Sequence, residues 1–472
     1  MLLPQIKPQN RFLILFISLN FLLSVFYLDK GFNWNSISRI LPIMSYFEQG
    51  NFQIDKYKDR TGDISYIKGH YYTDKAPLAT MLVLPVYKVL VTTGIIKRQN
   101  SWEDLLAIGI IGAFITAVIP FLLLLFLLMK RLLNINAAFS SVLLVMSLYG
   151  GMLFVFSSAF YSHLLAGIFT LSAYLLLKEN RFLLAGLLTG LAFASEFPLG
   201  IFLPIWALII LIKERSFKKS MLFVLGVVPF ILFIFYYNYY FTGSPFTMLY
   251  QFEAQQGFAD EFNSANTIFG FTLPRLENIW EMIFGQYKGL FFYMPILILI
   301  FLQLFKSVGK VRLKELTANY FVIPSLAFAG LIISKNISWW GGWTYGPRYL
   351  IPLCFLLVYE GVIFLAKTDF SKVWFYCLSG FGLICAWMAK STVVYSIPTE
   401  ENYPVFGYIA SKFTMGEFNQ NNILTMLFGV NAQWAAYLWL LLFICSILLL
   451  YFHFNRSYKS VFNEDKQANK LC

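Results

Sequence analysis

Apolar runs long enough to cross a bilayer recur along almost the whole chain. A run of about 18 or more apolar residues is typical of a membrane-spanning helix, and runs near or above that length are found between Phe12 and Phe452. Of the 472 residues, 58% are hydrophobic and only 13% are charged. The sequence therefore predicts an all-α polytopic integral membrane protein.

Twelve membrane spans are predicted, and the first follows a short basic leader. We interpret this first run as a retained anchor, because no small-residue cleavage site of a signal peptide follows it. The predicted spans cover residues 11–28, 105–129, 136–154, 159–177, 182–197, 198–213, 219–241, 290–305, 317–334, 349–366, 373–392 and 433–453. The apolar stretch 78–96 is left out, since Lys88 within it and Lys97 at its end favour a surface-lying or re-entrant segment.

The distribution of Lys and Arg supports this topology. With twelve spans and the N-terminus inside, the inner segments hold 20 of the 36 basic residues and only six of the 24 acidic ones. Inner loops of membrane proteins carry such an excess. A thirteenth span over 78–96 would move nearly all of these basic residues to the outer side. The net charge of +12 thus reflects membrane orientation, and no nucleic-acid partner is expected.

The predicted topology leaves four sizeable segments on the outer face. They are the loops 29–104, 242–289, 335–348 and 393–432. We divide the chain into an N-terminal transmembrane module, 1–241, which contains the largest first loop, and a C-terminal transmembrane region, 242–472.

The first outer loop contains a predicted amphipathic helix. Its apolar residues at helical spacing are Ile37, Ile40, Leu41 and Met44. Asn35 or Ser36 could cap this helix. We expect it to lie on the membrane surface.

Ionisable residues gather at the outer ends of the predicted spans. An ionised group costs about 2.5–3.5 kcal/mol at a span centre, so its depth is informative. The candidates are His163, Glu196 and Arg348 at span ends, and Asp55, Asp63, Asp74 and Lys75 in the first loop. Structural roles compete with each of them, among them snorkelling at the interface and simple solvation.

The loop around Arg348 combines one arginine with several aromatic residues and glycines. Trp340, Trp343 and Tyr345 could contact a sugar, because aromatic faces pack on its C–H surface, and Arg348 could bind a phosphate with two hydrogen bonds. Anchoring at the membrane interface is the alternative.

Motifs for other chemistries are missing from the sequence. It contains no Walker-type phosphate loop, HExxH or GxSxG motif. The five cysteines predict neither a disulfide framework nor a metal site; they are Cys354, Cys377, Cys385, Cys445 and Cys472. We expect no metal and no cofactor.

The order of the features resembles the membrane glycosyltransferases of the protein O-mannosyltransferase and lipid A aminoarabinose transferase type. The matching stretches are "FEQGNF", "KGHYYTDKAPLATMLVLPVYKVL", "LLAGLLTGLAFASEFPLGIFLPIWAL" and "GPRYLIPL". The likeness covers roughly the first 215 residues and a short piece near 346–353.

This resemblance implies transfer of a sugar from a polyprenyl-phosphate donor to an acceptor hydroxyl of a lipid or glycan. Lys75 stands where the family has the lysine that meets the lipid phosphate, and we assign Arg348, His163 and Glu196 to donor binding with it. The family's catalytic aspartate would fall near Asn35, which cannot take a proton.

We therefore expect the base to be another acid of the first loop. Asp55 ranks first because it follows the predicted amphipathic helix most closely, and Asp63 and Asp74 come next.

Two other functions remain open on the sequence alone. One is a multi-span transporter or flippase of lipid-linked sugars, and the other is a non-catalytic, lipid-binding relative. In each case we expect an integral protein of a bacterial inner membrane, with its active face outward.

Overall fold

The computed structural model describes residues 8–468 with internal gaps, and the described chain is almost wholly helical. The gaps are residues 28, 30–31, 100–101, 134, 136–138, 256, 258, 261–269, 309–318 and 336–338. Parts of the predicted outer loops 242–289 and 335–348 lie outside the described residues.

Six helices among the described residues are long and apolar enough to cross a membrane. They are Trp102–Leu132, Phe197–Glu214, Phe217–Thr242, Arg348–Ala366, Lys372–Thr392 and Ala432–Phe452. Shorter apolar helices accompany them, and each of the twelve predicted segments contains a helix. The predicted class, a helical membrane protein, is confirmed, while the number of crossings stays a prediction.

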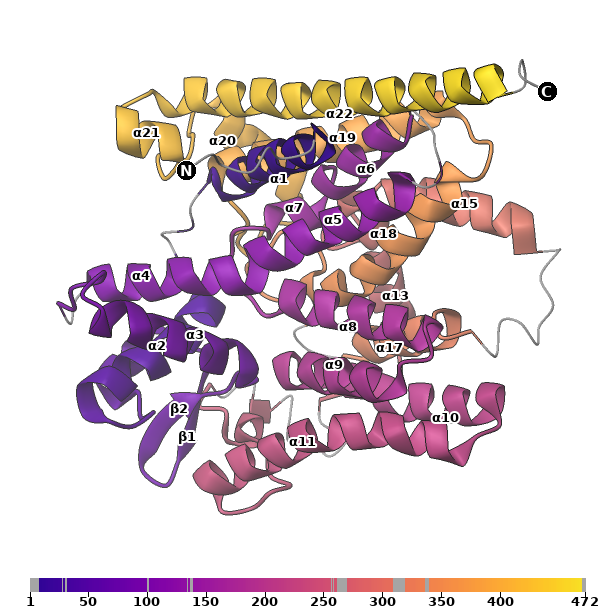
Figure 1. The fold of residues 1–472 in the computed structure, drawn as a ribbon. Helices are drawn as coiled ribbons and strands as arrows, with labels where there is room; N and C mark the ends of the chain where they lie inside the picture. The colour runs from indigo at the N-terminus through magenta and orange to yellow at the C-terminus, as the bar shows by residue number, and fades with distance from the viewer. Residues whose placement is uncertain are drawn as a thin grey trace, which may run out of the picture.

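The elements follow the chain in a simple order (Figure 1). The N-terminal helices are α1 (Pro8–Val25), α2 (Trp34–Gln49), α3 (Leu78–Thr92), α4 (Trp102–Ala113), α5 (Ile119–Leu133), α6 (Phe139–Tyr149), α7 (Met152–Val155), α8 (His163–Lys178), α9 (Phe182–Ser195), α10 (Phe202–Glu214) and α11 (Phe217–Thr242). The C-terminal helices are α13 (Leu276–Ile283), α14 (Leu290–Tyr293), α15 (Ile296–Val308), α17 (Val322–Ile333), α18 (Ile351–Ala366), α19 (Lys372–Thr392), α20 (Ala410–Thr414), α21 (Ile423–Phe428) and α22 (Ala432–Ala468). Short helical turns are η1 (Asp55–Arg60), η2 (Phe114–Val118), η3 (Phe197–Ile201), η4 (Leu249–Phe252), η5 (Arg348–Leu350) and η6 (Pro404–Ile409).

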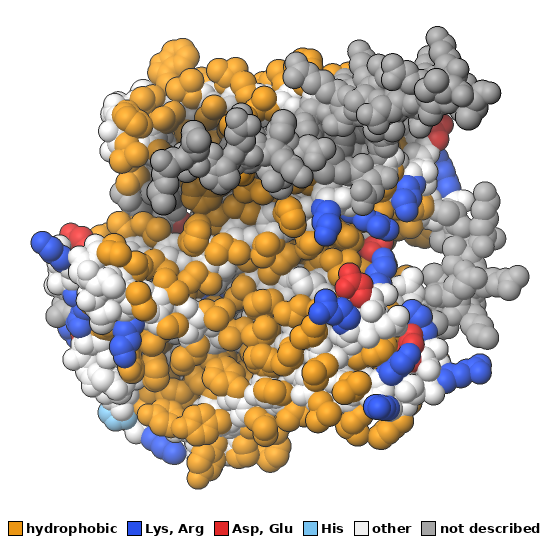
Figure 2. Space-filling view, in the orientation of Figure 1, with side chains coloured by type: hydrophobic (Ala, Val, Ile, Leu, Met, Phe, Trp, Pro, Cys, Tyr) orange, Lys and Arg blue, Asp and Glu red, His pale blue; other side chains and the backbone are white. Residues whose placement is uncertain are grey.

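The two ends of the helix bundle differ in character. In Figure 1 the long helices run side by side across the view, and α2, α3 and a small hairpin gather at the left. At their opposite ends, the last turns of α5, α8 and α10 carry Lys130, Arg131, Lys178 and Lys213. Figure 2 shows a broad hydrophobic band between the two ends, with Lys and Arg side chains along the right margin and others at the left margin. Such a band is what the hydrocarbon core of a bilayer would cover.

Helix α2 is the amphipathic helix predicted in the first loop. Asn33 caps it, its side chain accepting a hydrogen bond of 3.2 Å from the Ser36 N–H, so the predicted caps Asn35 and Ser36 were wrong. Asn33 has the extended backbone of a capping residue, whereas Asn35 and Ser36 are already in the first turn. The helix ends at Gly50, whose φ of +73° permits the left-handed turn.

The stretch 66–90 divides into a strand pair and a helix. Strands β1 (Ile64–Ile67) and β2 (His70–Thr73) are antiparallel, joined at Lys68 and Gly69, both with positive φ. This hairpin is a departure from the predicted all-α class. Helix α3 then buries Ala79, Val83 and Tyr87 with residues of α2 and α4, in one apolar cluster.

Helices α9 and α11 cross almost in backbone contact. A Cβ added at Gly186 would lie 2.0 Å from the Phe223 carbonyl oxygen, and one at Gly226 would lie 2.2 Å from that of Leu183. Small residues allow this close approach in membrane proteins. The crossing fixes the end of α9, which precedes Glu196, relative to α11, which leads to the second large loop.

Candidate functional site

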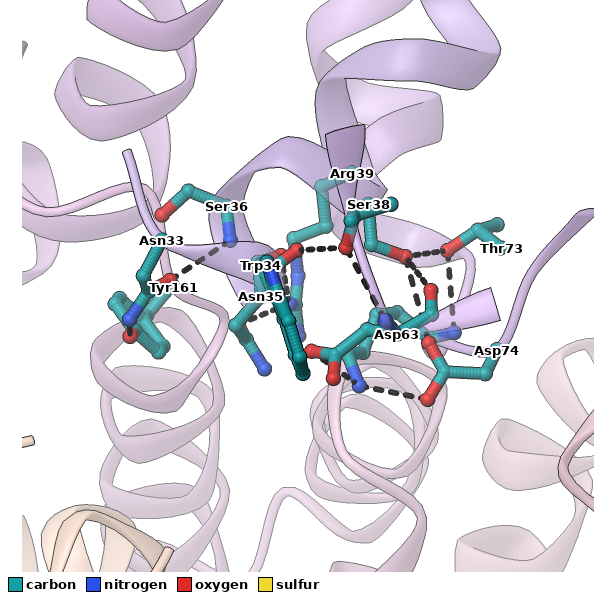
Figure 3. Close-up of polar contacts among 12 residues, drawn as sticks. Asn33, Trp34, Asn35, Ser36, Ser38, Arg39, Asp63, Thr73, Asp74 and Tyr161 are labelled. Atoms are coloured by element: carbon teal, nitrogen blue, oxygen red, sulfur yellow. Dashed lines mark hydrogen bonds and ion pairs between the residues drawn. The ribbon is translucent and has the colours of Figure 1, made fainter. Parts of the chain in front are cut away.

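Lys75 lies at the centre of a buried group of charges. Its Nζ is 2.8 Å from Asp63 Oδ2 and 2.7 Å from Asp74 Oδ2. Ser38 of α2 donates to the Asp63 carbonyl at 2.6 Å and is hydrogen-bonded to Thr73 Oγ1 at 2.7 Å. Figure 3 shows Ser38, on α2, hydrogen-bonded to Asp63 and Thr73. The structure thus brings together three of the predicted site residues.

The ionisation of this group is set by burial and by the two acids. Burial alone would lower the pKa of Lys75, but Asp63 and then Asp74 raise it well above its ordinary value. Burial raises the pKa of Asp74, and Lys75 opposes that rise only in part. Lys75 therefore stays a cation.

A segment of the second large loop covers Lys75. Ser65 of β1 forms a bridge with Glu253, and the Ala254 N–H donates to the Ile64 carbonyl at 2.9 Å. The Tyr250 ring centroid lies 5.5 Å from Lys75 Nζ. Residues 249–254 therefore extend the hairpin edge and close over the lysine.

Glu253 is a third acid at Lys75. It is 7% exposed, and its Oε1 is buried with no hydrogen-bond partner. Burial, and next the charge of Asp74, raise the pKa of Glu253 to about 9, so the carboxyl is protonated at neutral pH. One lysine holds two carboxylates, and the third acid remains neutral.

Arg39 connects the first loop to the transmembrane helices. Its guanidinium is 2% exposed; Nη1 donates to the Asn35 carbonyl at 3.0 Å, and Nη2 donates to Ser162 Oγ at 2.5 Å. Nη2 also lies 3.6 Å from Glu196 Oε1. The Nε–H of Arg39 is buried without a partner.

His163 and Glu196 form a direct pair. His163 Nδ1 lies 3.0 Å from Glu196 Oε1, to which Ser162 Oγ also donates. The ring stacks on Tyr161, with centroids 5.8 Å apart, and meets the edge of Tyr349 at 5.9 Å. Its Nε2 is buried without a partner.

Arg348 lies close to the same two aromatic residues. Its guanidinium carbon is 5.3 Å from the centroid of Tyr161 and 5.1 Å from that of Tyr349. Arg348 is 8% exposed, and its Nε–H has no partner. Among the described residues, three buried nitrogen atoms have no hydrogen-bond partner, one each on Arg39, His163 and Arg348. Buried polar groups normally have one, so these atoms are suited to a ligand.

Lys288 holds the aromatic loop before Arg348. Its Nζ donates to the carbonyl oxygens of Gly342, at 3.2 Å, and Thr344. Burial lowers the pKa of Lys288 to about 7.

The three aromatic residues predicted to contact a sugar occupy different surroundings. Trp343 is 51% exposed, and Trp340 is half-buried. Tyr345 is 1% exposed and packs against Tyr293, with ring centroids 4.6 Å apart, so it lies in the apolar core.

Asp55 is placed apart from the other predicted acids. Its Oδ2 is 2.7 Å from His70 Nδ1, and its Oδ1 accepts from the Tyr71 N–H at 2.6 Å. The side chains of Asp55 and His70 are 40% and 45% exposed. Asp55 thus stabilises the outer side of the hairpin.

An apolar hollow opens beside the charged group. Thr73 and Pro77, on either side of Asp74 and Lys75, line it together with Met81 of α3 and with Tyr237 and Phe241 of α11. A charged group and an apolar hollow are therefore neighbours at this end of the bundle.

Several site residues were missed in the sequence. Glu253 and Tyr250 belong to a loop far from Lys75 in sequence, and nothing local marks them. Arg39 had one signal, since it is a lone cation on the largely apolar amphipathic helix. Among the described residues, no group of three or more His, Cys, Asp or Glu side chains is placed to hold a metal ion.

Comparison with known proteins identified no relative. No protein-family model matches the chain, and no curated protein matches it.

Proposed function

We propose that this protein is an integral-membrane glycosyltransferase that takes a sugar from a polyprenyl-phosphate donor. The acceptor is a hydroxyl of a lipid or glycan, and transfer takes place on the outer face of a bacterial inner membrane. The observation that carries the proposal is the buried Lys75, held by Asp63 and Asp74 next to an apolar hollow.

The orientation is supported by the two ends of the bundle. The basic last turns of α5, α8 and α10 lie at the end of the bundle opposite α2, α3 and the hairpin (Figure 1). Under the positive-inside rule, those turns face the cytoplasm, and the end with α2, α3 and the hairpin faces outward. The twelve-span topology fits this orientation.

The chemistry of the donor matches the neighbourhood of Lys75. A lipid-linked sugar phosphate needs a cation for its phosphate and an apolar surface for its isoprenoid chain. Charge-assisted hydrogen bonds to phosphate are strong where water is partly excluded. Lys75 and Arg348 supply cations, and Met81, Tyr237 and Phe241 supply apolar surface.

The proposed reaction needs no redox partner. The acceptor oxygen forms a bond to the anomeric carbon as its proton leaves to a base. The bond between that carbon and the phosphate oxygen breaks, and the phosphate leaves with the electron pair. Lys75 and Arg348 stabilise this developing charge.

A binding measurement with undecaprenyl phosphate tests the proposal. Titrated into the detergent-solubilised protein, the lipid should bind the wild type, and Lys75→Ala should weaken binding about tenfold or more. Lys88→Ala, on the exposed face of α3, is the matched control and should bind as the wild type does. Equal binding by all three proteins would remove Lys75 from the site. Binding without sugar transfer, but with lipid movement across vesicles, would favour a flippase.

A further inference from the structure

Each of the three acids predicted as the base is already engaged by another group. Asp63 and Asp74 are both engaged with Lys75 at less than 3 Å. Asp55 is engaged with His70 and the Tyr71 N–H at the half-exposed edge of the hairpin. A carboxylate already held by a cation is a weaker base. Other groups of the site are therefore candidates for the base.

His163 has the geometry of an oriented base. A carboxylate can only accept, so the contact of 3.0 Å between His163 Nδ1 and Glu196 Oε1 places the proton of the neutral ring on Nδ1. The lone pair is then on Nε2, which is buried and has no hydrogen-bond partner among the described residues. Glu196 is itself fixed by Ser162 and by Arg39. A base oriented by a hydrogen-bonded carboxylate is a recurring catalytic arrangement.

His163 lies near Arg348, the cation proposed to stabilise the departing phosphate. His163 and Arg348 share the Tyr161 and Tyr349 rings as neighbours. The charged groups that act on the imidazole are Glu196, Arg348 and Arg39. Two cations and one carboxylate therefore surround the ring.

We infer that His163, oriented by Glu196, is the proton acceptor of the transfer reaction. This inference rests on the proposed glycosyl transfer. The acceptor hydroxyl gives its proton to Nε2 as its oxygen bonds to the anomeric carbon, and the lipid phosphate departs with the electron pair. Glu196 stabilises the imidazolium that forms. The proton returns to solvent when product leaves.

The tautomer of His163 can be determined in the absence of any substrate. The chain has only three histidines, so ¹⁵N-histidine NMR of the protein in nanodiscs gives few signals. One ring should be neutral with its proton on Nδ1, and that signal should vanish in His163→Gln. In Glu196→Gln the ring should lose its single tautomer. A His163 ring that is protonated on Nε2 in the wild type would overturn the inference.

Measurements of turnover distinguish a catalytic role of His163 from a structural one. With undecaprenyl-phosphate mannose and undecaprenyl-phosphate aminoarabinose as probes, His163→Gln should lower kcat about a hundredfold or more with little change in donor KM. Wild-type kcat should fall on acidification as the imidazole takes a proton, and the residual activity of His163→Gln should lack this fall. Should His163→Gln fail to fold, Glu196→Gln carries the same expectation of a lowered kcat.

His70→Gln is the matched control, because His70 also pairs with a carboxylate but lies at the exposed hairpin edge. It should keep wild-type kcat. Full turnover in His163→Gln would overturn the inference while leaving the proposed function intact. A wild type that transfers neither sugar would overturn the proposed function and the inference together.

Discussion

Lys75, just after β2, forms an ion pair of 2.8 Å with Asp63, just before β1, and the two side chains are only 8% and 14% exposed. Asp63→Asn removes one of the two charges that hold the lysine. Because Lys75 keeps Asp74, we expect the free energy of unfolding to fall by about 1–3 kcal/mol. Denaturant unfolding in detergent measures it. Asp59→Asn, on the exposed η1 turn, is the control and should change stability by less than about 0.5 kcal/mol.

Asp55→Asn tests the residue that sequence reasoning ranked first as the base. Its contacts with His70 and Tyr71 are confined to the hairpin edge, so we expect sugar transfer to persist and stability to drop by about 1 kcal/mol at most. Turnover with the same two lipid-linked sugars measures whether transfer persists. Loss of most turnover in this variant, with donor binding retained, would restore Asp55 as the base.

Glu253→Gln should change how stability depends on pH. The pKa of Glu253 is raised by burial from 4.5 to about 9, so the folded protein binds a proton that the unfolded chain releases. This contribution to stability is complete below pH 4.5 and is lost as pH rises towards 9. Thermal unfolding between pH 5 and pH 9 should therefore show a steeper decline for the wild type than for Glu253→Gln. Parallel curves for the two proteins would contradict a buried neutral Glu253.

Lys288→Met should loosen the loop that leads to Arg348. The methionine keeps the apolar stem but loses the hydrogen bonds to Gly342 and Thr344. We expect faster hydrogen exchange in residues 339–346, with the helices unchanged. Lys412→Met, which removes an ion pair of 2.5 Å to the exposed Glu417, is the control and should leave that loop unaffected. Unchanged exchange in both variants would mean that the loop is held by its other contacts.

Cysteine labelling tests the orientation of the bundle. In a cysteine-free background, Lys97→Cys should react with a membrane-impermeant reagent from outside, and Lys130→Cys only from the cytoplasm, since both positions are exposed at opposite ends. The reverse pattern would place Lys75 inside and remove the basis for transfer on the outer face.

Much of the helical framework could be predicted from the sequence, because apolar runs and helical spacing are local signals. The helix over Trp34–Gln49 was predicted from four apolar residues, and its cap was misplaced by two or three positions. The hairpin was missed, since Tyr66, Tyr71 and Tyr72 stand in a short polar stretch next to a strongly apolar one.

The site was predictable only where its members are close in sequence. Asp63, Asp74 and Lys75 flank one hairpin, so they were found together. Glu253 reaches Lys75 by pairing of residues 249–254 with β1, which no local pattern encodes. Tyr345 was taken for a surface ring, but tertiary packing against Tyr293 placed it in the core.

The crossing of α9 and α11 sets a rule for recognising relatives of this chain. A methyl group at Gly186 or at Gly226 would collide with the backbone of the facing helix, and no rotamer change can relieve a clash with backbone. A homologue can exchange every residue around Lys75 and still need glycine at both crossing points. One glycine in each helix of this pair, at the crossing point, can therefore identify relatives independently of the chemistry of the site. A search with these two glycines can find relatives whose activity has changed.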